Sequence, residues 1–117
     1  MNYRAIRYSD VLLMAAEANN RKTSADDTKA QNYLNQVRAR AFGNSSQASS
    51  SSGATLTQEI WDERRLELAM EGHRFFDLVR TGEAATKVSG FTSGKHEVFP
   101  IPQTEIDISG LTQNPGY

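Results

Sequence analysis

The sequence of 117 residues predicts an all-α protein: a helix–turn–helix pair, a central helix and an irregular C-terminal tail that contains prolines. Apolar residues recur at helical spacing over residues 10–21 and again over residues 26–41, with a short polar turn between them. A third stretch with helical spacing begins near Thr57. Pro100 and Pro102 fix an extended path in the tail and exclude a helix at that point.

The first helix is expected over about residues 10–21. Ser9 is a suitable N-cap, and Asp10 adds negative charge to the first turn. One face of this helix is predicted to pack inward, with Val11 and Ala18 beside it; it consists of Leu12, Ala15, Ala16 and Asn19. Glu17 lies among the alanines, where it either faces solvent or pairs with an arginine of the central helix.

The second helix is expected over about residues 26–41, capped by Ser24 or Asp26 and ended by Gly43. Its apolar face consists of Ala30, Leu34, Val37 and Ala41, with Tyr33 at the edge. A helix, a short turn and a second helix within about 34 residues match the size of one tetratricopeptide unit. Residues 43–56 are rich in serine, and they are predicted to form a flexible loop.

The central stretch, residues 63–80, mixes charges and apolar side chains in an unusual way. Before Gly72, charged side chains share one helix face with Ile60, and after it they repeat every three residues beside two phenylalanines. This pattern predicts a structural network of Arg–carboxylate pairs, while a functional site with perturbed ionisation is the alternative. The predicted network consists of Arg64, Glu67, Glu71, Arg74, Asp77 and Arg80.

Composition and motifs exclude several kinds of site. The net charge of −1 provides no basic surface for nucleic acid, and without cysteine there is no disulfide or thiolate chemistry. No metal-ligand spacing, phosphate loop or nucleophile motif is present, so no metal, cofactor or catalytic residue is predicted. Glu67 and Glu71 could form a glycosidase pair, but neighbouring arginines would keep both ionised. Trp61 is expected in the core, with a sugar-stacking surface as the alternative.

Five stretches, in order, resemble the C-terminal part of the SusD/RagB family. They are residues 7–19 (RYSDVLLMAAEAN), 33–41 (YLNQVRARA), 63–80 (ERRLELAMEGHRFFDLVR), 100–106 (PIPQTEI) and 113–117 (QNPGY). The resemblance implies an all-helical, tetratricopeptide-like fold. It also implies a surface-exposed outer-membrane lipoprotein that captures glycans or other nutrients for a TonB-dependent transporter, and that is not an enzyme.

Family members are several times longer and begin with a signal peptide and a lipidated cysteine, which this sequence lacks. No run of about 20 apolar residues that could span a bilayer is present either. Residues 1–117 are therefore expected to be a single domain or a fragment of such a protein. The family's ligand-contacting residues lie mostly upstream, so no ligand-binding residue is assigned. A free-standing protein-interaction module is the alternative function, and a glycosidase is a third hypothesis.

Overall fold

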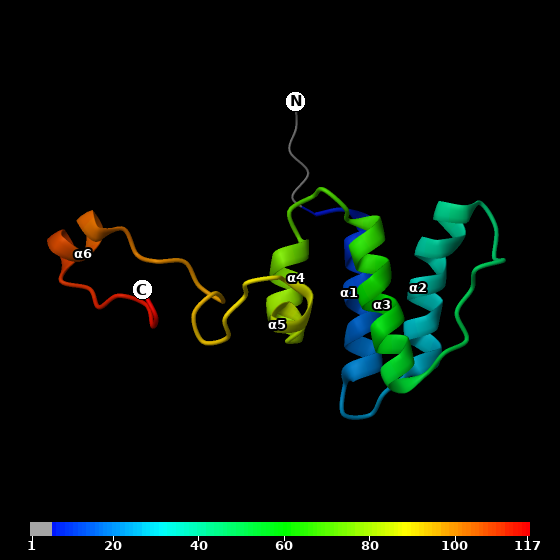
Figure 1. The fold of residues 1–117 in the computed structure, drawn as a ribbon. Coiled ribbons are helices and arrows are strands. Elements are labelled where there is room, and N and C mark those ends of the chain that lie inside the picture. The colour runs from blue at the N-terminus through cyan, green and yellow to red at the C-terminus, as the bar shows by residue number, and fades with distance from the viewer. Residues whose placement is uncertain (1–5) are drawn as a thin grey trace. The chain divides into compact units, whose positions relative to one another are not determined.

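The computed structural model describes residues 6–117, and over that range all regular structure is helical (Figure 1). This confirms the all-α prediction. The chain forms two compact units, of which the first ends at Arg74 and the second is Phe75–Tyr117. The helices are α1 (Tyr8–Arg21), α2 (Asp27–Phe42), α3 (Gly53–Glu67), α4 (Arg74–Thr81), α5 (Ala84–Lys87) and α6 (Gln103–Ser109). Within the described range, no helix has the length and apolar character needed to cross a membrane.

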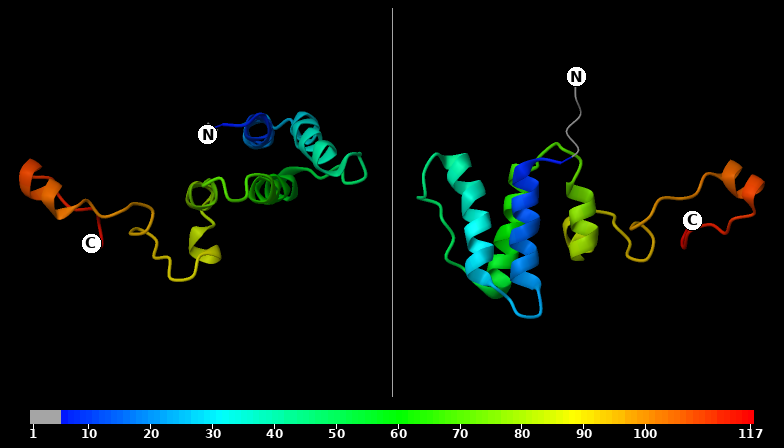
Figure 2. Two further views of the ribbon diagram at one scale, coloured as in Figure 1. Left: turned by 90° about the horizontal axis from the view of Figure 1, so that it is seen from above. Right: turned by 180° about the vertical axis from the view of Figure 1, so that it is seen from behind.

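The first unit is a three-helix bundle. Its helices run side by side in both views of Figure 2, with α1 and α2 antiparallel and joined by the turn of residues 22–26. This arrangement is the predicted helix–turn–helix pair with the central helix added. The core is formed by apolar side chains from all three helices; they are Leu12, Leu13, Ala16, Ala30, Leu34, Val37, Leu56 and Ile60.

The ends of α2 agree with the sequence prediction, whereas the start of α1 does not. Asp26 caps α2 by accepting a hydrogen bond from the backbone N–H of Lys29 at 3.0 Å, and Gly43 ends it with a φ of 71°. Helix α1 begins at Tyr8, so Ser9 is not its N-cap; Arg7 holds that position. The reason is that the carbonyl of Arg7 already accepts a helical hydrogen bond from Val11.

The inward face of α1 also differs from the predicted one. Leu13 and Ala16 are fully buried, whereas Ala15 is only half-buried and Val11 is exposed. The sequence pattern misled because α1 carries apolar residues on both of its sides. On α2, Leu34 and its neighbours in the core are buried as predicted, but Ala41 is exposed near the helix end.

The serine-rich loop is held against α2 by hydrogen bonds. The side-chain amide of Asn35 donates to the carbonyl of Ser49 at 3.0 Å and accepts from the N–H of Ser49 at 2.7 Å. Gln31 donates to the carbonyl of Ser51 at 2.7 Å. The loop is shorter than the expected residues 43–56, because α3 begins at Gly53. The flexibility of the loop stays a prediction.

An acidic side chain of α2 holds the first residue of α3. Asp27 accepts hydrogen bonds from the N–H of Gly53 and from the side chain of Asn20, each at 2.8 Å. These bonds, first that from Asn20 and then that from Gly53, lower the pKa of Asp27. Thr57, near which this helix was expected to begin, lies inside α3, and Ser52 occupies the N-cap position.

The second unit contains short helices joined by irregular segments. Gly82, with a φ of 77°, follows the last residue of α4. Helix α5 was not predicted, and α6 forms within the tail that was expected to be irregular. The ring of Phe75 lies 6.1–6.5 Å from the rings of Phe76, Phe91 and Phe99.

Candidate functional site

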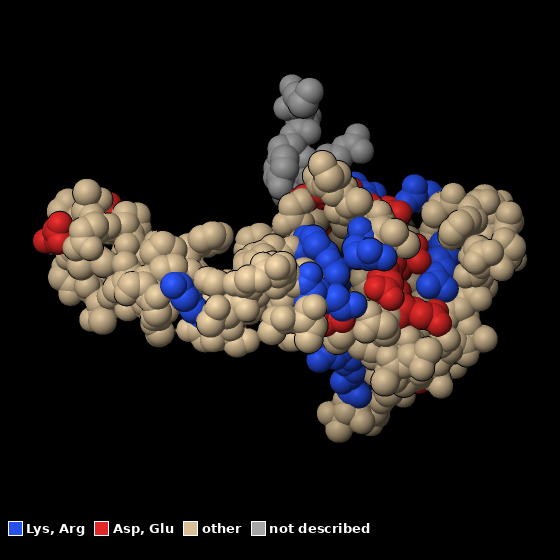
Figure 3. Space-filling model, viewed as in Figure 1, with Lys and Arg blue, Asp and Glu red and all other residues tan. Residues whose placement is uncertain are grey.

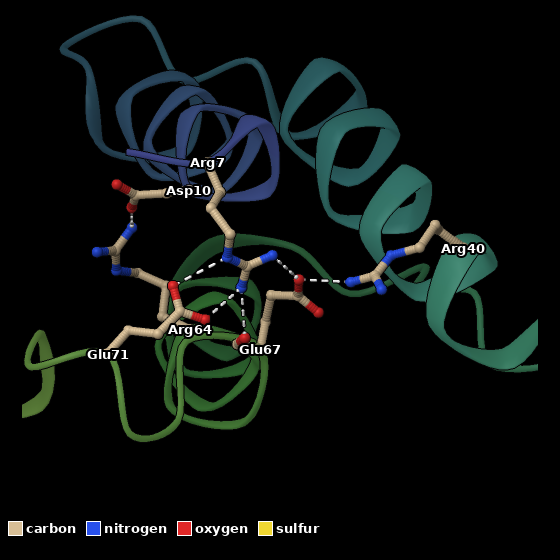
Figure 4. Close-up of polar contacts among 6 residues, drawn as sticks. All are labelled: Arg7, Asp10, Arg40, Arg64, Glu67 and Glu71. Carbon is tan, nitrogen blue, oxygen red and sulfur yellow. Dashed lines mark hydrogen bonds and ion pairs between the residues drawn. The ribbon is translucent and has the colours of Figure 1, made fainter. Parts of the chain in front are cut away.

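Arg7 joins the start of α1 to the end of α3 and the residues that follow it. Its guanidinium donates to both carboxylate oxygens of Glu71 at 2.8 and 2.9 Å (Figure 4). It also donates to the carboxylate of Glu67 at 3.0 Å and to the backbone carbonyl of Glu67 at 2.7 Å. Arg40 of α2 reaches the same carboxylate of Glu67. One carboxylate thus connects all three helices of the bundle.

This cluster is partly shielded from solvent. The side chain of Glu67 is 8% exposed, while those of Arg7 and Glu71 are 26% and 33% exposed. The hydrogen bonds from Arg7 lower the pKa of Glu71, and its own bonds to Glu71 and Glu67 raise the pKa of Arg7. Because its pKa is lowered, Glu71 is not suited to act as a proton donor at neutral pH.

A second ion pair lies deeper between α1 and α3. Arg64 donates to Asp10 at 2.7 Å, and each side chain is only 6% exposed. Charges that have lost most of their water need a partner with good geometry, because an unpaired buried charge is strongly destabilising. The pair therefore joins α1 to α3 where both side chains are almost fully buried.

A third cluster joins α2 to α3. Arg38 donates to Glu63 at 2.9 Å and to Glu59 at 3.2 Å. Figure 3 shows basic and acidic side chains interspersed over the face of the bundle that carries α3. These three groups of arginine–carboxylate contacts join the helices of the bundle outside its small apolar core.

The predicted network residues lie in different places. Arg64, Glu67 and Glu71 contact α1 or α2 in the first unit, as described above. In the second unit, Arg80 donates to Asp77 at 2.8 Å, one turn apart on α4. Arg74 is the first residue of α4 and is half-buried.

Sequence reasoning missed the partners that lie outside residues 63–80, namely Arg7, Asp10 and Arg40. Arg7 and Asp10 belong to the first of the five stretches quoted above, and Arg40 to the second. The presence of charged residues within these separate motifs was the available signal that they pair with the charged block. Which residue pairs with which could not be deduced from it.

Two further sequence alternatives concern Glu17 and Trp61. Glu17 does not face solvent: it is buried and accepts a hydrogen bond from Arg21 of its own helix at 2.8 Å. Trp61 is half-buried, and the guanidinium carbon of Arg21 lies 5.5 Å from the centre of its ring system. An arginine over the ring leaves that part of the tryptophan unsuited to sugar stacking.

An open groove lies between the start of α1 and the end of α2. Its volume is about 690 Å³, and its lining is mainly apolar. Ile6 and Tyr8 on its rim are 67% and 73% exposed. The groove is lined by Ile6, Arg7, Tyr8, Ser9, Leu12, Gln36, Val37, Ala39 and Arg40.

Comparison with known proteins gives one consistent result. The profile of the SusD family matches residues 1–98. Among curated proteins, SusD-like protein P2 of Formosa agariphila is 33% identical over an alignment of 133 residues. The alignment covers 99% of this chain and 26% of that protein. SusD-like proteins P25 and P38 of the same organism are 39% and 40% identical, over 88% and 95% of this chain and 21% and 24% of their own lengths. The chain thus spans about a quarter of these relatives.

Proposed function

This chain belongs to the SusD family, and we propose that it is a non-catalytic scaffold segment of an outer-membrane protein that captures nutrients. The observation that carries the proposal is that charged residues within the block 63–80 form ion pairs with other helices. Arg64 and Glu67 of this block bind charged partners on α1, at its N-cap and on α2. Their geometry suits holding helices together.

In this proposal the whole protein takes up glycans or other nutrients at the cell surface and passes them to a TonB-dependent transporter. Membership of the SusD family supports the nutrient-binding role and the outer-membrane location. The ligand and transporter contacts would be made mainly by the other three-quarters of the protein, as the share of each relative covered by this chain suggests.

We further propose that the predicted network has a docking role. Arg64, Glu67 and Glu71 would set how α3 and the following turn sit on the helix pair, and the Asp77–Arg80 pair would stabilise α4. Arg74 is included because it precedes this pair in the same block. The pairing of Glu67 and Glu71 with arginine argues against a glycosidase, since such an enzyme needs one protonated carboxylic acid.

The first test titrates the isolated chain with maltoheptaose, cellohexaose and an oligogalacturonate by calorimetry. We expect no saturable binding at millimolar sugar, because no assigned ligand-contacting residue lies in this segment. Saturable binding at micromolar sugar would contradict the scaffold assignment. Hydrolysis of any of these sugars that disappears in a folded Glu67→Gln variant would establish an enzyme instead.

The second test places the chain in a complete relative. In a chimera, this chain replaces the aligned quarter of SusD-like protein P2, and we expect the chimera to fold and to reach the outer membrane as P2 does. P2 with that quarter deleted is the control and should not accumulate as folded protein. If the chimera and the deletion behave alike, the chain does not supply the scaffold.

A free-standing protein-interaction module is the second candidate, and the exposed apolar groove beside α1 favours it. In that case the groove would bind a separate protein. The two candidates differ in whether the groove is covered within a complete SusD-family protein, which can be measured directly.

A further inference from the structure

Helix α1 is apolar on two opposite sides. One side, with Leu13 and Ala16 at its centre, is buried in the core of the bundle. The other side carries a row of residues that we call the α1 stripe; it consists of Tyr8, Val11, Met14, Ala15 and Ala18. At 3.6 residues per turn, this row lies on the side of α1 away from Leu13 and Ala16.

The α1 stripe is open to solvent in this structure. Tyr8 is 73% exposed, Val11 44% and Met14 45%. Figure 2, seen from behind, shows α1 in front of α3. A surface helix usually keeps charged or polar residues on its outer side, and a helix that is apolar all round is usually buried. The composition of α1 is therefore that of a helix covered on both sides.

The groove extends the stripe onto α2. Tyr8 belongs to both, and Ala39 of α2 continues the apolar surface across the groove. Ala15 and Ala18 have short side chains, so another helix can approach the backbone of α1 closely there. A row of apolar residues beside a groove is the surface that an amphipathic helix binds. Arg40, which is 62% exposed at the groove, would favour a carboxylate on that helix.

We propose that the α1 stripe and the groove bind an amphipathic α-helix from the part of the same polypeptide that lies outside this sequence. The inference rests on the proposed function, because it requires this chain to be a segment of a longer SusD-family protein. The relatives support that source, since 74–79% of their length lies outside the region that P2 and P25 share with this chain. Such a length contains ample chain for one more helix.

The first experiment measures hydroxyl-radical oxidation of Met14 by mass spectrometry, in the isolated chain and in the chimera with P2. Oxidation of methionine follows its exposure to solvent, so we expect the rate at Met14 to fall at least about fivefold in the chimera. The isolated chain is kept dilute and checked as a monomer. Equal rates in the isolated chain and a folded chimera would overturn the inference.

Paired substitutions provide the second measurement. Met14→Lys should leave the Tm of the isolated chain unchanged but lower that of the chimera by about 2–4 °C or more, because a lysine would be buried without a partner there. Asn32→Lys, which adds the same charge to an exposed polar position on α2, is the matched control and should change neither Tm. Equal Tm values for Met14→Lys and Asn32→Lys in the chimera would contradict the inference.

The outcomes separate this inference from the proposed function. A folded chimera with exposed Met14 overturns the inference alone. Protection of Met14 together with tight sugar binding by the isolated chain overturns the scaffold assignment alone. Protection that appears in the isolated chain as its concentration rises would mean that a second copy covers the stripe, and this would replace the proposed occupant.

Discussion

At the scale of single residues, the arginines of this protein act as connectors between helices. Arg7 and Arg38 each use several N–H groups of the guanidinium to bind more than one oxygen, as Arg7 does with Glu67 and Glu71. The lysine ammonium has no such planar fork, so lysine would not reproduce this geometry. The charge of these residues matters less than their ability to bind two partners at fixed angles.

The buried pair of Arg64 and Asp10 gives the first prediction. Arg64→Met should lower the free energy of unfolding by about 3–5 kcal/mol, because Asp10 would remain buried with its charge unpaired. Urea denaturation measures this loss. The double variant Arg64→Met/Asp10→Leu should be less destabilised than the sum of the two single variants. If the two effects simply add, the residues are not coupled.

The second prediction concerns pH. Because the pKa of Glu71 is lower in the folded chain than in the unfolded one, the unfolded chain takes up a proton first as pH falls. The stabilisation by Arg7 is therefore complete above the ordinary glutamate pKa of about 4.3 and is lost as pH falls through the lowered value. Arg7→Met should show a smaller loss of Tm between neutral pH and about pH 3.

The control for this titration is Arg65→Met, which removes an exposed arginine from α3, the helix that precedes Glu71. Its Tm should change with pH as that of the unsubstituted chain does. If Arg65→Met and Arg7→Met have the same acid dependence, the contact between Arg7 and Glu71 is not its source.

At the scale of elements, side-chain amides hold a segment that has few apolar side chains of its own. The serine-rich loop buries little, yet Asn35 of α2 binds both the N–H and the carbonyl of Ser49. These two bonds satisfy the backbone N–H and carbonyl of one residue, as a neighbouring strand does in a β-sheet. The sequence showed the polar composition of this loop but not the amides that bind it.

The third prediction tests this attachment. Asn35→Ala should release the loop, since the N–H and carbonyl of Ser49 would lose their partners, at a cost of about 1–3 kcal/mol. Faster hydrogen exchange at Ser49 and faster proteolysis of residues 44–52 would report the release. Asn32→Ala, one turn earlier on the exposed side of α2, should leave both rates unchanged. Equal rates in the two variants would show that the loop is held by other contacts.

At the scale of the whole molecule, the apolar core belongs to one unit. All eight residues of the main core cluster lie on α1, α2 and α3. The second unit has few buried apolar residues, Leu78 and Ala84 among them. Its aromatic rings contact one another, and the side chain of Gln113 binds the backbone N–H and carbonyl of Ile101 at 2.8 and 2.9 Å.

The fourth prediction follows from this distribution. A chain that ends at Arg74 should keep the helical far-ultraviolet circular dichroism of the bundle and unfold in a cooperative transition, because its core is complete. The matched chain that begins at Phe75 should show no cooperative transition. A non-cooperative or unfolded first unit would mean that the core needs contacts beyond α1, α2 and α3.

Local patterns were sufficient to predict much of this protein. The helical class, the cap at Asp26 and the helix end before Gly43 depend on residues a few positions apart, and all are present in the structure. The five motifs were sufficient to identify the family, which the comparisons confirm. The short helix α5 was missed, because four residues carry too little periodicity to be recognised.

The sequence by itself determined the helical class, the family and one charged block, residues 63–80, from which several of the paired side chains come. The tertiary structure decided which side of α1 faces the core, because periodicity cannot choose between two apolar sides of one helix. It also decided the partners, since Arg64 and Asp10 are 54 positions apart and Arg7 and Glu71 are 64 apart. Such contacts depend on how helices pack in space, which no local spacing of residues encodes.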